Sequence, residues 1–407
     1  MIPMSENKEI LGRVRCLAGV PEPTVCPEVP FAEERMEFLN ALSARLRKDP
    51  RTAQYTDVAA FAFWCRKANT KRLSEQLTRD GIRIGKGLVF HIAPSNVPVN
   101  FAYSLALGLL SGNANIVRVS SKPFSQVDII CEALAALFAG EEYAAIRACT
   151  SVVSYGHDKE ITDYYSAICD MRVIWGGDAS IQTIRESSTQ SRCGEIAFAD
   201  RYSFGIIRPS AVMAMDDEAL RQLAVNFYND TYLLDQNACS TPHLIVWLTD
   251  SEAEKTARPE AAARFWQAVY EAAASYDLAD IKVSGKYDAL CNFLADTGLE
   301  KARVQRYDNR LYVLTLSELP EKIDGLRGSF GMFFQCGLDA LDDLAPHITK
   351  KVQTAAVCGV ERKEITDLIL RCHLRGIDRV VGFGQTLDMG TIWDGYDIIG
   401  DLTRIIG

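Results

Sequence analysis

Residues 87–98 read Gly-Leu-Val-Phe-His-Ile-Ala-Pro-Ser-Asn-Val-Pro, and residues 111–121 read Ser-Gly-Asn-Ala-Asn-Ile-Val-Arg-Val-Ser-Ser. Each stretch holds a short apolar run bounded by glycine, proline or serine, which is typical of a buried strand. The residues between them, 98–111, are apolar enough to form a buried helix. A strand, a helix and a second strand in this order predict a βαβ unit with two parallel strands in one sheet.

The same alternation continues along the chain and restarts near residue 204. Helical periodicity comes first, in residues 31–46 and 58–77. Further strands are expected at 151–155, 171–175, 205–208, 244–248 and 311–316, and further helices at 125–138, 159–167, 217–229 and 258–275. Strands that alternate with helices predict an α/β fold of two doubly wound domains with parallel sheets. We place the first domain at 1–204 and the second at 205–384. Residues 385–407 are expected to be a C-terminal segment that returns to the first domain or lies at a subunit interface.

Length and composition fit this expectation and exclude several classes of protein. A chain of 407 residues exceeds what one core usually supports, so two domains are expected. The net charge of −9 disfavours a nucleic-acid binder, which needs clustered Lys and Arg. No apolar run is long enough to span a membrane, and the first residues lack the layout of a signal peptide. The twelve cysteines show no CxxC pair, so we expect no zinc site. We expect a cytoplasmic protein with reduced thiols.

Cys239 is the cysteine with the most informative position. It follows a helix-like run and precedes the apolar strand-like residues 244–248. A thiol at such a junction can face a cleft between two domains instead of lying in a core. The alternative is that Cys239 is a small buried hydrophobic residue, which is the usual role of a lone cysteine.

Three segments lie where predicted parallel strands end, and ligands bind at that edge of an open α/β sheet. They are Pro94–Asn96, Ser120–Lys122 and the run Gly176-Gly177-Asp178. The last opens a helix, whose free N–H groups can hold a pyrophosphate, although plain turn geometry also explains two glycines. The sequence contains neither GxGxxG nor GxxxxGK[ST], so both common nucleotide fingerprints are missing.

Several motifs together resemble one known superfamily. Residues 87–98 and 111–121, then Phe227-Tyr-Asn and Asp235-Gln-Asn-Ala-Cys239, are similar to the aldehyde dehydrogenases. Within that superfamily the chain resembles the acyl-CoA reductases of the bacterial bioluminescence fatty-acid reductase type. The marks of that family are Trp175-Gly-Gly-Asp, Ala238-Cys-Ser-Thr-Pro, Gly376-Ile-Asp-Arg-Val-Val and Trp393-Asp-Gly-Tyr-Asp. The resemblance covers residues 85–407.

The resemblance implies a role for two catalytic residues. Cys239 would attack a thioester carbonyl and form an acyl-enzyme, and a local positive field would be needed to favour its thiolate. The side-chain amide of Asn96 and the backbone N–H of Cys239 would stabilise the negative oxygen that results. Without the resemblance, Asn96 can equally be a turn residue before a helix.

The cofactor implied by the resemblance is a nicotinamide dinucleotide, held by Arg118, Ser120, Ser121, Gly176 and Gly177. Arg118 stands where the superfamily usually has a lysine that contacts the adenosine ribose. Because a guanidinium pairs bidentately with phosphate, Arg118 favours NADPH, while NADH stays open. The alternative for Arg118 is an exposed charge at the end of a strand.

The chain departs from the hydrolytic aldehyde dehydrogenases at their water-activating glutamate. That position falls near Ala197, with Glu195 two residues away. A missing base suits an acyl-enzyme that awaits hydride, so we expect reduction of an acyl thioester to the aldehyde. A hydrolytic aldehyde dehydrogenase and a cofactor-independent Cys acyltransferase or thioesterase remain as alternatives. The expected partners are an acyl-CoA or acyl-protein thioester, an acyl-protein ligase, and further copies of the chain in a homo-oligomer.

Other charged residues are expected to be structural or solvent-facing. His243 follows Cys239 by four residues but begins the predicted strand, so it is expected to point elsewhere. Arg371, Arg375 and Arg379 recur at four-residue spacing and are expected on the exposed face of one helix.

Overall fold

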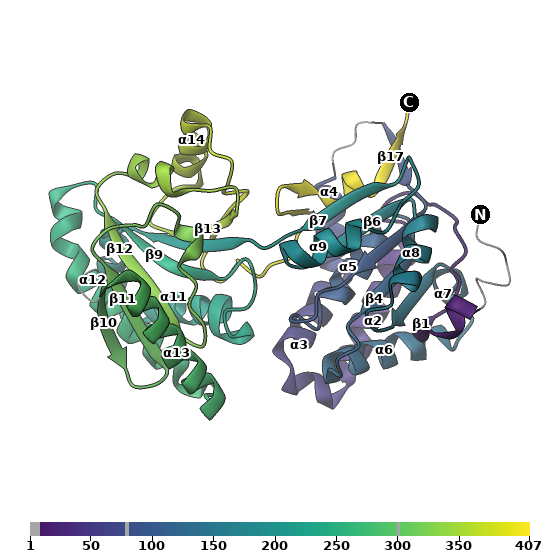
Figure 1. The fold of residues 1–407 in the computed structure, drawn as a ribbon, viewed down its shortest axis with the longest axis horizontal. Coiled ribbons are helices and arrows are strands. Elements are labelled where there is room, and N and C mark those ends of the chain that lie inside the picture. Colours follow the sequence, from purple (N-terminus) through teal and green to yellow (C-terminus); the bar gives the residue numbers. More distant parts are fainter. Residues whose placement is uncertain (1–8, 78–80, 299–301) are drawn as a thin grey trace. The chain divides into compact units, whose positions relative to one another are not determined.

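The computed structural model describes residues 9–77, 81–298 and 302–407, which fall into two compact units (Figure 1). Unit 1 runs to Asp200 and also takes in residues 389–407, whereas unit 2 comprises residues 201–388. The expected boundary after residue 204 therefore falls inside strand β8 (Tyr202–Ile207) of unit 2. The reason is that β8 joins the sheet of unit 2 from its first residue, since the Tyr202 N–H donates to the Lys351 carbonyl at 2.8 Å.

Unit 1 is built on a six-stranded sheet. In spatial order its strands are β1 (Arg15–Gly19), β5 (Thr150–Ser154), β4 (Ala114–Val119), β3 (Leu88–Ile92), β6 (Met171–Trp175) and β7 (Gly194–Phe198). All neighbours are parallel except β1 and β5. The chain runs outward from β3 to β4 and β5 and then crosses back to β6, so the sheet is doubly wound with a switch point between β3 and β6.

The main helices of unit 1 follow these strands. They are α2 (Glu33–Lys48), α5 (Asn100–Leu110), α6 (Ser125–Phe138), α8 (Lys159–Ile168) and α9 (Asp178–Arg185). Strand β17 (Thr403–Ile406), from the C-terminal residues, pairs antiparallel with β2 (Ile82–Gly85). The other short elements are α7 (Ala144–Ala148), α15 (Ile398–Asp401), β15 (Ile392–Trp393) and β16 (Tyr396–Asp397).

The single helix expected over residues 58–77 is two helices, α3 (Thr56–Trp64) and α4 (Lys67–Glu75). The break is stable because side chains satisfy the freed backbone groups. Asn40 accepts a hydrogen bond from the Lys67 N–H at 3.0 Å, and the Asn69 side chain donates to the Trp64 carbonyl at 2.8 Å. A helical hydrophobic period continues across such a break, so the pattern alone does not reveal it.

A buried polar network lies at the centre of unit 1. His91 on β3 accepts a hydrogen bond at Nδ1 from the Ser104 hydroxyl (2.8 Å) and donates from Nε2 to the side-chain Oδ1 of Asn115 (3.0 Å). The Trp175 indole donates to the same Ser104 oxygen at 3.0 Å, which leaves the hydroxyl proton for the imidazole. Burial lowers the pKa of His91 to about 4, so the ring is neutral at physiological pH.

The neutral His91 makes the stability of unit 1 depend on pH. Its pKa is about 6.5 in an unfolded chain and about 4 in the fold, so between these values the unfolded chain binds one more proton. The stability that unit 1 gains from a neutral His91 is fully present above pH 6.5. It falls by about 3 kcal/mol as the pH is lowered from 6.5 to 4. Denaturant titrations from pH 7 to 4 should therefore show a flatter pH dependence for His91→Gln than for the wild type. Equal slopes would contradict the prediction.

Unit 2 is built on a seven-stranded sheet. In spatial order its strands are β10 (Ala302–Tyr307), β11 (Leu311–Leu316), β12 (Met332–Leu338), β9 (Pro242–Leu248), β8, β13 (Val352–Cys358) and β14 (Arg379–Gly382). All neighbours are parallel except β10 and β11. The principal helices are α10 (Pro209–Met213), α11 (Asp217–Thr231), α12 (Glu252–Ala272), α13 (Asp280–Thr297) and α14 (Arg362–Cys372).

Both faces of the unit 2 sheet are covered. Along β9, Leu244 and Val246 pack in one apolar cluster, whereas Ile245 and Trp247 pack in another. Because successive side chains of a strand point to opposite faces, the two clusters are the cores on the two sides of the sheet. Unit 2 is thus a three-layered α/β unit, as the continuous apolar run of β9 predicts.

Candidate active site

Cys239 lies in the turn that connects α11 to β9, and it is half-buried. The turn is tied to the two central strands next to it. The Ser203 hydroxyl on β8 donates to the Cys239 carbonyl at 2.8 Å, and the Thr354 N–H on β13 donates to the same hydroxyl oxygen at 3.2 Å. Ser203 and Thr354 are fully buried, so the thiol is carried by backbone that the core of unit 2 holds in place.

The residues before Cys239 are fixed as firmly. Asp235 and Gln236 adopt left-handed backbone angles, with φ of 52° and 61°. The buried Gln236 amide compensates for this unusual backbone, since it donates to the Met332 carbonyl (3.0 Å) and accepts from the Gly331 N–H (2.7 Å). Functional side chains held by such packed polar contacts keep one geometry, and Cys239 meets that condition.

A positive group interacts electrostatically with the thiol. Arg379 opens β14, and its guanidinium donates to the carbonyls of Thr386 (2.7 Å), Asp388 (2.8 Å) and Gln385 (2.9 Å). Burial lowers the pKa of Arg379, while the negative charges of Asp388, Asp230 and an ionised Cys239 oppose that shift. Arginine stays protonated nonetheless, so Arg379 contributes positive charge to the electrostatic field at Cys239.

Asp230 connects the thiol turn with the segment that holds Arg379. Its backbone carbonyl accepts a hydrogen bond at 2.9 Å from the hydroxyl of Thr241, which lies two residues after Cys239. Its carboxylate accepts from the backbone N–H groups of Gly384 (2.6 Å) and Thr386 (3.1 Å). Burial raises the pKa of Asp230 to about 6. One buried residue therefore holds both the turn of Cys239, through its backbone carbonyl, and the loop that binds the Arg379 guanidinium, through its carboxylate.

The expectation that Arg379 shares a helix with Arg371 and Arg375 is wrong. Helix α14 ends at Cys372, because His373 adopts a left-handed conformation with φ of 51°. Arg379 belongs instead to the edge strand β14, and sequence analysis missed its position near Cys239. The available signal was its place inside the family mark Gly376-Ile-Asp-Arg-Val-Val.

His243 has a structural position in the core of unit 2. It is buried on β9, and its ring stacks on that of Tyr202 with 5.6 Å between centroids. Burial lowers the pKa of His243 to about 3, so it is a neutral core residue.

Asn96 lies in unit 1, in the loop from β3 to α5, and its side chain is exposed. It is not the cap of α5, because the helix begins at Asn100 and its N-cap position is Val99. Within residues 9–77, 81–298 and 302–407, no group forms a hydrogen bond with the Asn96 amide. The alternative role as a helix cap is therefore not supported, and the amide is available to a ligand.

The expected cofactor loops follow three adjacent parallel strands. Asn96 follows β3, Ser120 and Ser121 follow β4, and Gly176 and Gly177 follow β6. Carboxyl ends of parallel strands meet at one edge, so these loops share the edge at which α/β sheets bind ligands.

The glycine turn fits a phosphate group by geometry. Gly177 is the N-cap of α9, which has no side-chain cap, and a Cβ added at Gly177 would meet no atom within 4 Å. There is therefore open space at Gly177, next to the N-terminus of α9, and a helix N-terminus is an arrangement that binds anions. The Asp178 carboxylate in the first turn of α9 would repel a phosphate, so binding of a phosphate here depends on the backbone N–H donors.

Arg118 lies at the carboxyl end of β4, on the side of β5. Its Nη2 donates to the Gly156 carbonyl at 3.2 Å, and the guanidinium lies over the Tyr155 ring, 4.7 Å from its centroid. Its Nε is buried without a partner among the described residues. The planar group is thus oriented at the ligand edge of the sheet with hydrogen-bonding capacity left over, as a phosphate-binding arginine needs.

Glu195 is not placed as a free base. Its carboxylate accepts hydrogen bonds from Arg172 Nη2 (2.6 Å) and Nε (2.9 Å), and from Arg185 Nε (2.7 Å). Arg172 is almost fully buried and lies opposite Glu195 in the β6–β7 pair. Both carboxylate oxygens are therefore engaged in a structural ion pair at the start of β7.

This arrangement predicts a structural rather than a catalytic effect for Glu195→Gln. Removing the carboxylate leaves the buried guanidinium of Arg172 without its counter-charge, which should lower the free energy of unfolding by about 2–4 kcal/mol. Chemical denaturation measures that loss. At a temperature where the variant is folded, its turnover should match that of the wild type, and a specific loss of turnover would contradict the structural role.

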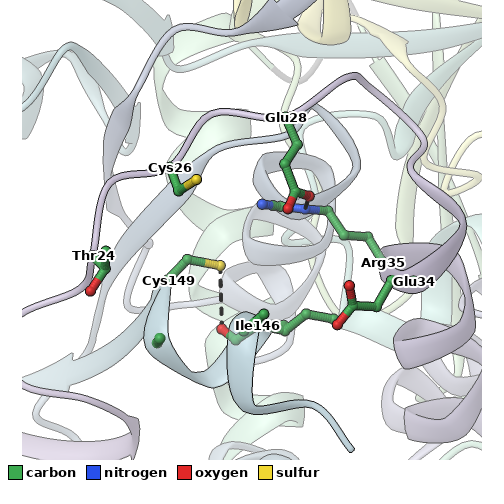
Figure 2. A pocket seen from close by; sticks show the side chains of 9 residues that line it. Thr24, Cys26, Glu28, Glu34, Arg35, Ile146 and Cys149 are labelled. Carbon is green, nitrogen blue, oxygen red and sulfur yellow. Dashed lines mark hydrogen bonds and ion pairs between the residues drawn. The ribbon is translucent and has the colours of Figure 1, made fainter.

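A small pocket of unit 1 lies elsewhere (Figure 2). It has a volume of about 210 Å³ and is lined by Thr24, Cys26 and Cys149, and by the Glu28–Arg35 ion pair. Cys149 directly precedes β5, so the pocket lies at the amino ends of the parallel strands. It is on the opposite edge from the loops after β3, β4 and β6 and does not belong to the candidate site.

The described residues contain no helix long and apolar enough to cross a membrane. They also contain no group of three or more His, Cys, Asp or Glu side chains that could hold a metal ion.

Comparison with solved structures gives the class of fold. Lactaldehyde dehydrogenase from Escherichia coli is similar over 91% of this chain and 85% of its own (TM-score 0.62, 13% identity). An NAD-dependent benzaldehyde dehydrogenase from Corynebacterium glutamicum is similar over 92% and 84% (TM-score 0.57, 17% identity). A proline utilization A mutant from Bradyrhizobium japonicum matches 93% of this chain (TM-score 0.59, 14% identity), but the chain spans only 42% of that protein. The fold is aldehyde dehydrogenase-like, and the predicted fold class is confirmed.

The family follows from a second comparison. The family model described as acyl-CoA reductase (LuxC) matches residues 71–405, most of the chain. The chain belongs to the LuxC acyl-CoA reductase family, so the predicted resemblance is confirmed, and so is the prediction of an oxidoreductase that acts on acyl or aldehyde groups. No curated protein matches the sequence.

Proposed function

We propose that this protein reduces an acyl thioester to the aldehyde with NADPH, through a covalent intermediate on Cys239. The observation that carries the proposal is the half-buried Cys239 thiol, held in a fixed turn beside Arg379, in a chain of the acyl-CoA reductase family. A thiolate is both a good nucleophile toward thioesters and a good leaving group, and the reaction needs both properties.

The residues of the chain act in sequence. The Cys239 thiolate attacks the carbonyl carbon of the thioester, and the carbonyl oxygen becomes negative in the tetrahedral intermediate. Collapse of this intermediate expels the thiolate of the acyl donor and leaves an acyl-cysteine. Bound NADPH supplies hydride. After reduction, the oxygen attached to the former carbonyl carbon is again negative, and the C–S bond to Cys239 breaks to give aldehyde and thiolate. We assign the oxygen's stabilisation in both steps to the Asn96 amide and the Cys239 backbone N–H.

Hydrolysis of the acyl-enzyme is disfavoured by the state of Glu195. The candidate water-activating carboxylate, on the second residue of β7, is bound by two arginines. Without a base to activate water, an acyl-cysteine persists until hydride reaches it. This supports reduction over the hydrolytic alternative.

The cofactor is assigned to the loops after β4 and β6. Gly176 and Gly177 would hold the pyrophosphate with backbone N–H groups, and Ser120 and Ser121 would assist Arg118 at the adenosine ribose. Two strand spacings, roughly 10 Å, separate β4 from β6, and this fits the distance between the ends of an adenosine diphosphate.

Arg118→Met should shift cofactor preference toward NADH. The bidentate contact with a ribose phosphate would be lost, so KM for NADPH should rise by about 10- to 100-fold. KM for NADH should change little. Arg118→Lys is the matched control, since it keeps the positive charge, and its KM for NADPH should rise less than that of Arg118→Met. Equal KM increases for both cofactors would contradict the assignment of Arg118 to the phosphate.

Product analysis tests the reaction itself. Incubation with a fatty acyl-CoA and NADPH should yield aldehyde and free coenzyme A in equal amounts, whereas aldehyde with NADP should yield no free acid in the absence of coenzyme A. Acid from either mixture would favour the hydrolytic dehydrogenase. Acid without any need for cofactor would favour the thioesterase.

The partners belong to the proposal as well. The acyl donor is a coenzyme A or protein thioester. Because the sequence has no ATP-binding loop, free acids would need activation by an acyl-protein ligase. We also propose a homo-oligomeric assembly in the cytoplasm.

A further inference from the structure

Gln353 is a buried polar residue that neither the sequence motifs nor the fold explains. It lies on β13, is 1% exposed, and its side-chain Nε2 donates a hydrogen bond to the Sγ of Cys239 at 3.6 Å. That distance is normal for a nitrogen–sulfur contact. An amide buried in a core costs free energy unless its donors are used, so its position requires a reason.

The backbone at Gln353 is irregular in a way that directs this side chain. In the β13–β8 pair, Val352 lies opposite Tyr202 and Thr354 lies opposite Ser203, so Gln353 is one extra residue inserted into β13. Such a β-bulge breaks the alternation of faces and re-aims one side chain. The Thr354 N–H next to the bulge donates to Ser203, the residue that also holds the Cys239 carbonyl. The bulge and the thiol turn are therefore joined through one hydroxyl.

We infer that Gln353 stabilises the thiolate of Cys239, both when it attacks the acyl donor and when it leaves from the reduced intermediate. This inference deepens the proposed function and rests on it for the nucleophilic role of Cys239. A hydrogen bond donated to the charged form of a group favours that form. Gln353 acts together with Arg379, and its Nε2 is in hydrogen-bonding contact with the thiol. Because the amide is neutral, it does not attract the phosphates of an acyl-CoA as a cation would.

The test is the pH dependence of alkylation of Cys239 by iodoacetamide, followed at the Cys239 peptide by mass spectrometry. Reading one peptide is necessary because Cys26 and Cys291 are exposed and the pKa of Cys193 is lowered to about 7 by its contact with Cys169. In Gln353→Met the donor is lost at similar volume. The midpoint, which is the pH at which Cys239 is alkylated at half its maximal rate, should rise by about one pH unit. Alkylation at pH 7 should slow about tenfold.

Two further variants keep the test decisive. Gln353→Glu replaces the donor with a negative group and should raise the midpoint at least as far, and it carries the test alone if Gln353→Met does not fold. Gln335→Met is the matched control, because Gln335 is also a buried glutamine of the same sheet, on β12, but accepts from Trp247 (2.8 Å) and Trp266 (2.7 Å). Its midpoint should equal that of the wild type.

The outcomes separate this inference from the proposed function. Midpoints in the Gln353 variants that coincide with the wild type would overturn the role of Gln353. A raised midpoint in both Gln353 variants and in Gln335→Met would also overturn it, because the effect would then follow from loosened packing. If the midpoints shift as expected but Cys239 takes no acyl group from any thioester, the inference about the thiolate holds and the proposed function fails.

Discussion

Cys239→Ala should abolish aldehyde formation, with a fall in kcat of at least about 10³-fold. The reason is that the proposed reaction has no other group that can take the acyl chain, and removing a covalent nucleophile is among the costliest changes in an enzyme. The measurement is NADPH-dependent aldehyde production from a fatty acyl-CoA. The variant should keep its fold, because Cys239 is half-buried and the hydrogen bond that its backbone carbonyl accepts from Ser203 is kept, while the side-chain contact with Gln353 is lost.

Cys291→Ala provides the matched control for this prediction. Cys291 is an exposed thiol on α13 of the same unit, so its loss should leave kcat unchanged. NADPH binding, followed as a thermal shift, should survive in both variants. Aldehyde formation by Cys239→Ala at more than one tenth of the wild-type rate would show that acyl transfer to this thiol is not part of the reaction.

Asn96→Ala should lower kcat by about 10²–10³-fold, with little change in KM for the acyl donor. Loss of one preorganised donor to an oxyanion typically has an effect of this size, because the donor acts on charge that exists only in the transition state. The exposed amide of Asn96, which no described residue binds, is consistent with a group that waits for substrate. Steady-state kinetics with saturating NADPH measures the effect.

The control for Asn96 distinguishes this role from a general loss of an amide. Asn292 is an exposed asparagine on α13, and Asn292→Ala should behave as the wild type. Asn96→Asp should be as impaired as Asn96→Ala, because a carboxylate repels the developing negative oxygen. A rise in KM with an unchanged kcat would contradict the assignment and would make Asn96 a ground-state binding residue.

Much of the fold could be predicted because its strands and helices carry strong periodic patterns. Helix α6 and strands β6 and β11 begin and end at the predicted residues. Strand β13, by contrast, was not predicted, since Val352–Cys358 contains alanines, a threonine and Gln353 where a buried strand usually has branched apolar residues. Such a strand is recognisable only from its neighbours β8 and β14.

The candidate site could be predicted where chemistry lies in one motif and not where the fold assembles it. Cys239 and Asn96 stand in quoted motifs. Gln353 and Arg379 reach the thiol through a β-bulge and an edge strand, and the arginine spacing pointed to a helix instead. Glu195 was left open for the same reason: its partner Arg172 is on another strand, and only strand pairing brings them together.

The most direct test of the central claim is intact mass after incubation with a fatty acyl-CoA in the absence of reductant. We predict one acyl adduct on the wild type, none on Cys239→Ala, and release of the adduct as aldehyde when NADPH is added. An acyl adduct that hydrolyses to free acid without added cofactor would contradict reduction and favour the hydrolytic alternative. No adduct with any acyl thioester, from coenzyme A or from a carrier protein, would contradict the covalent role of Cys239.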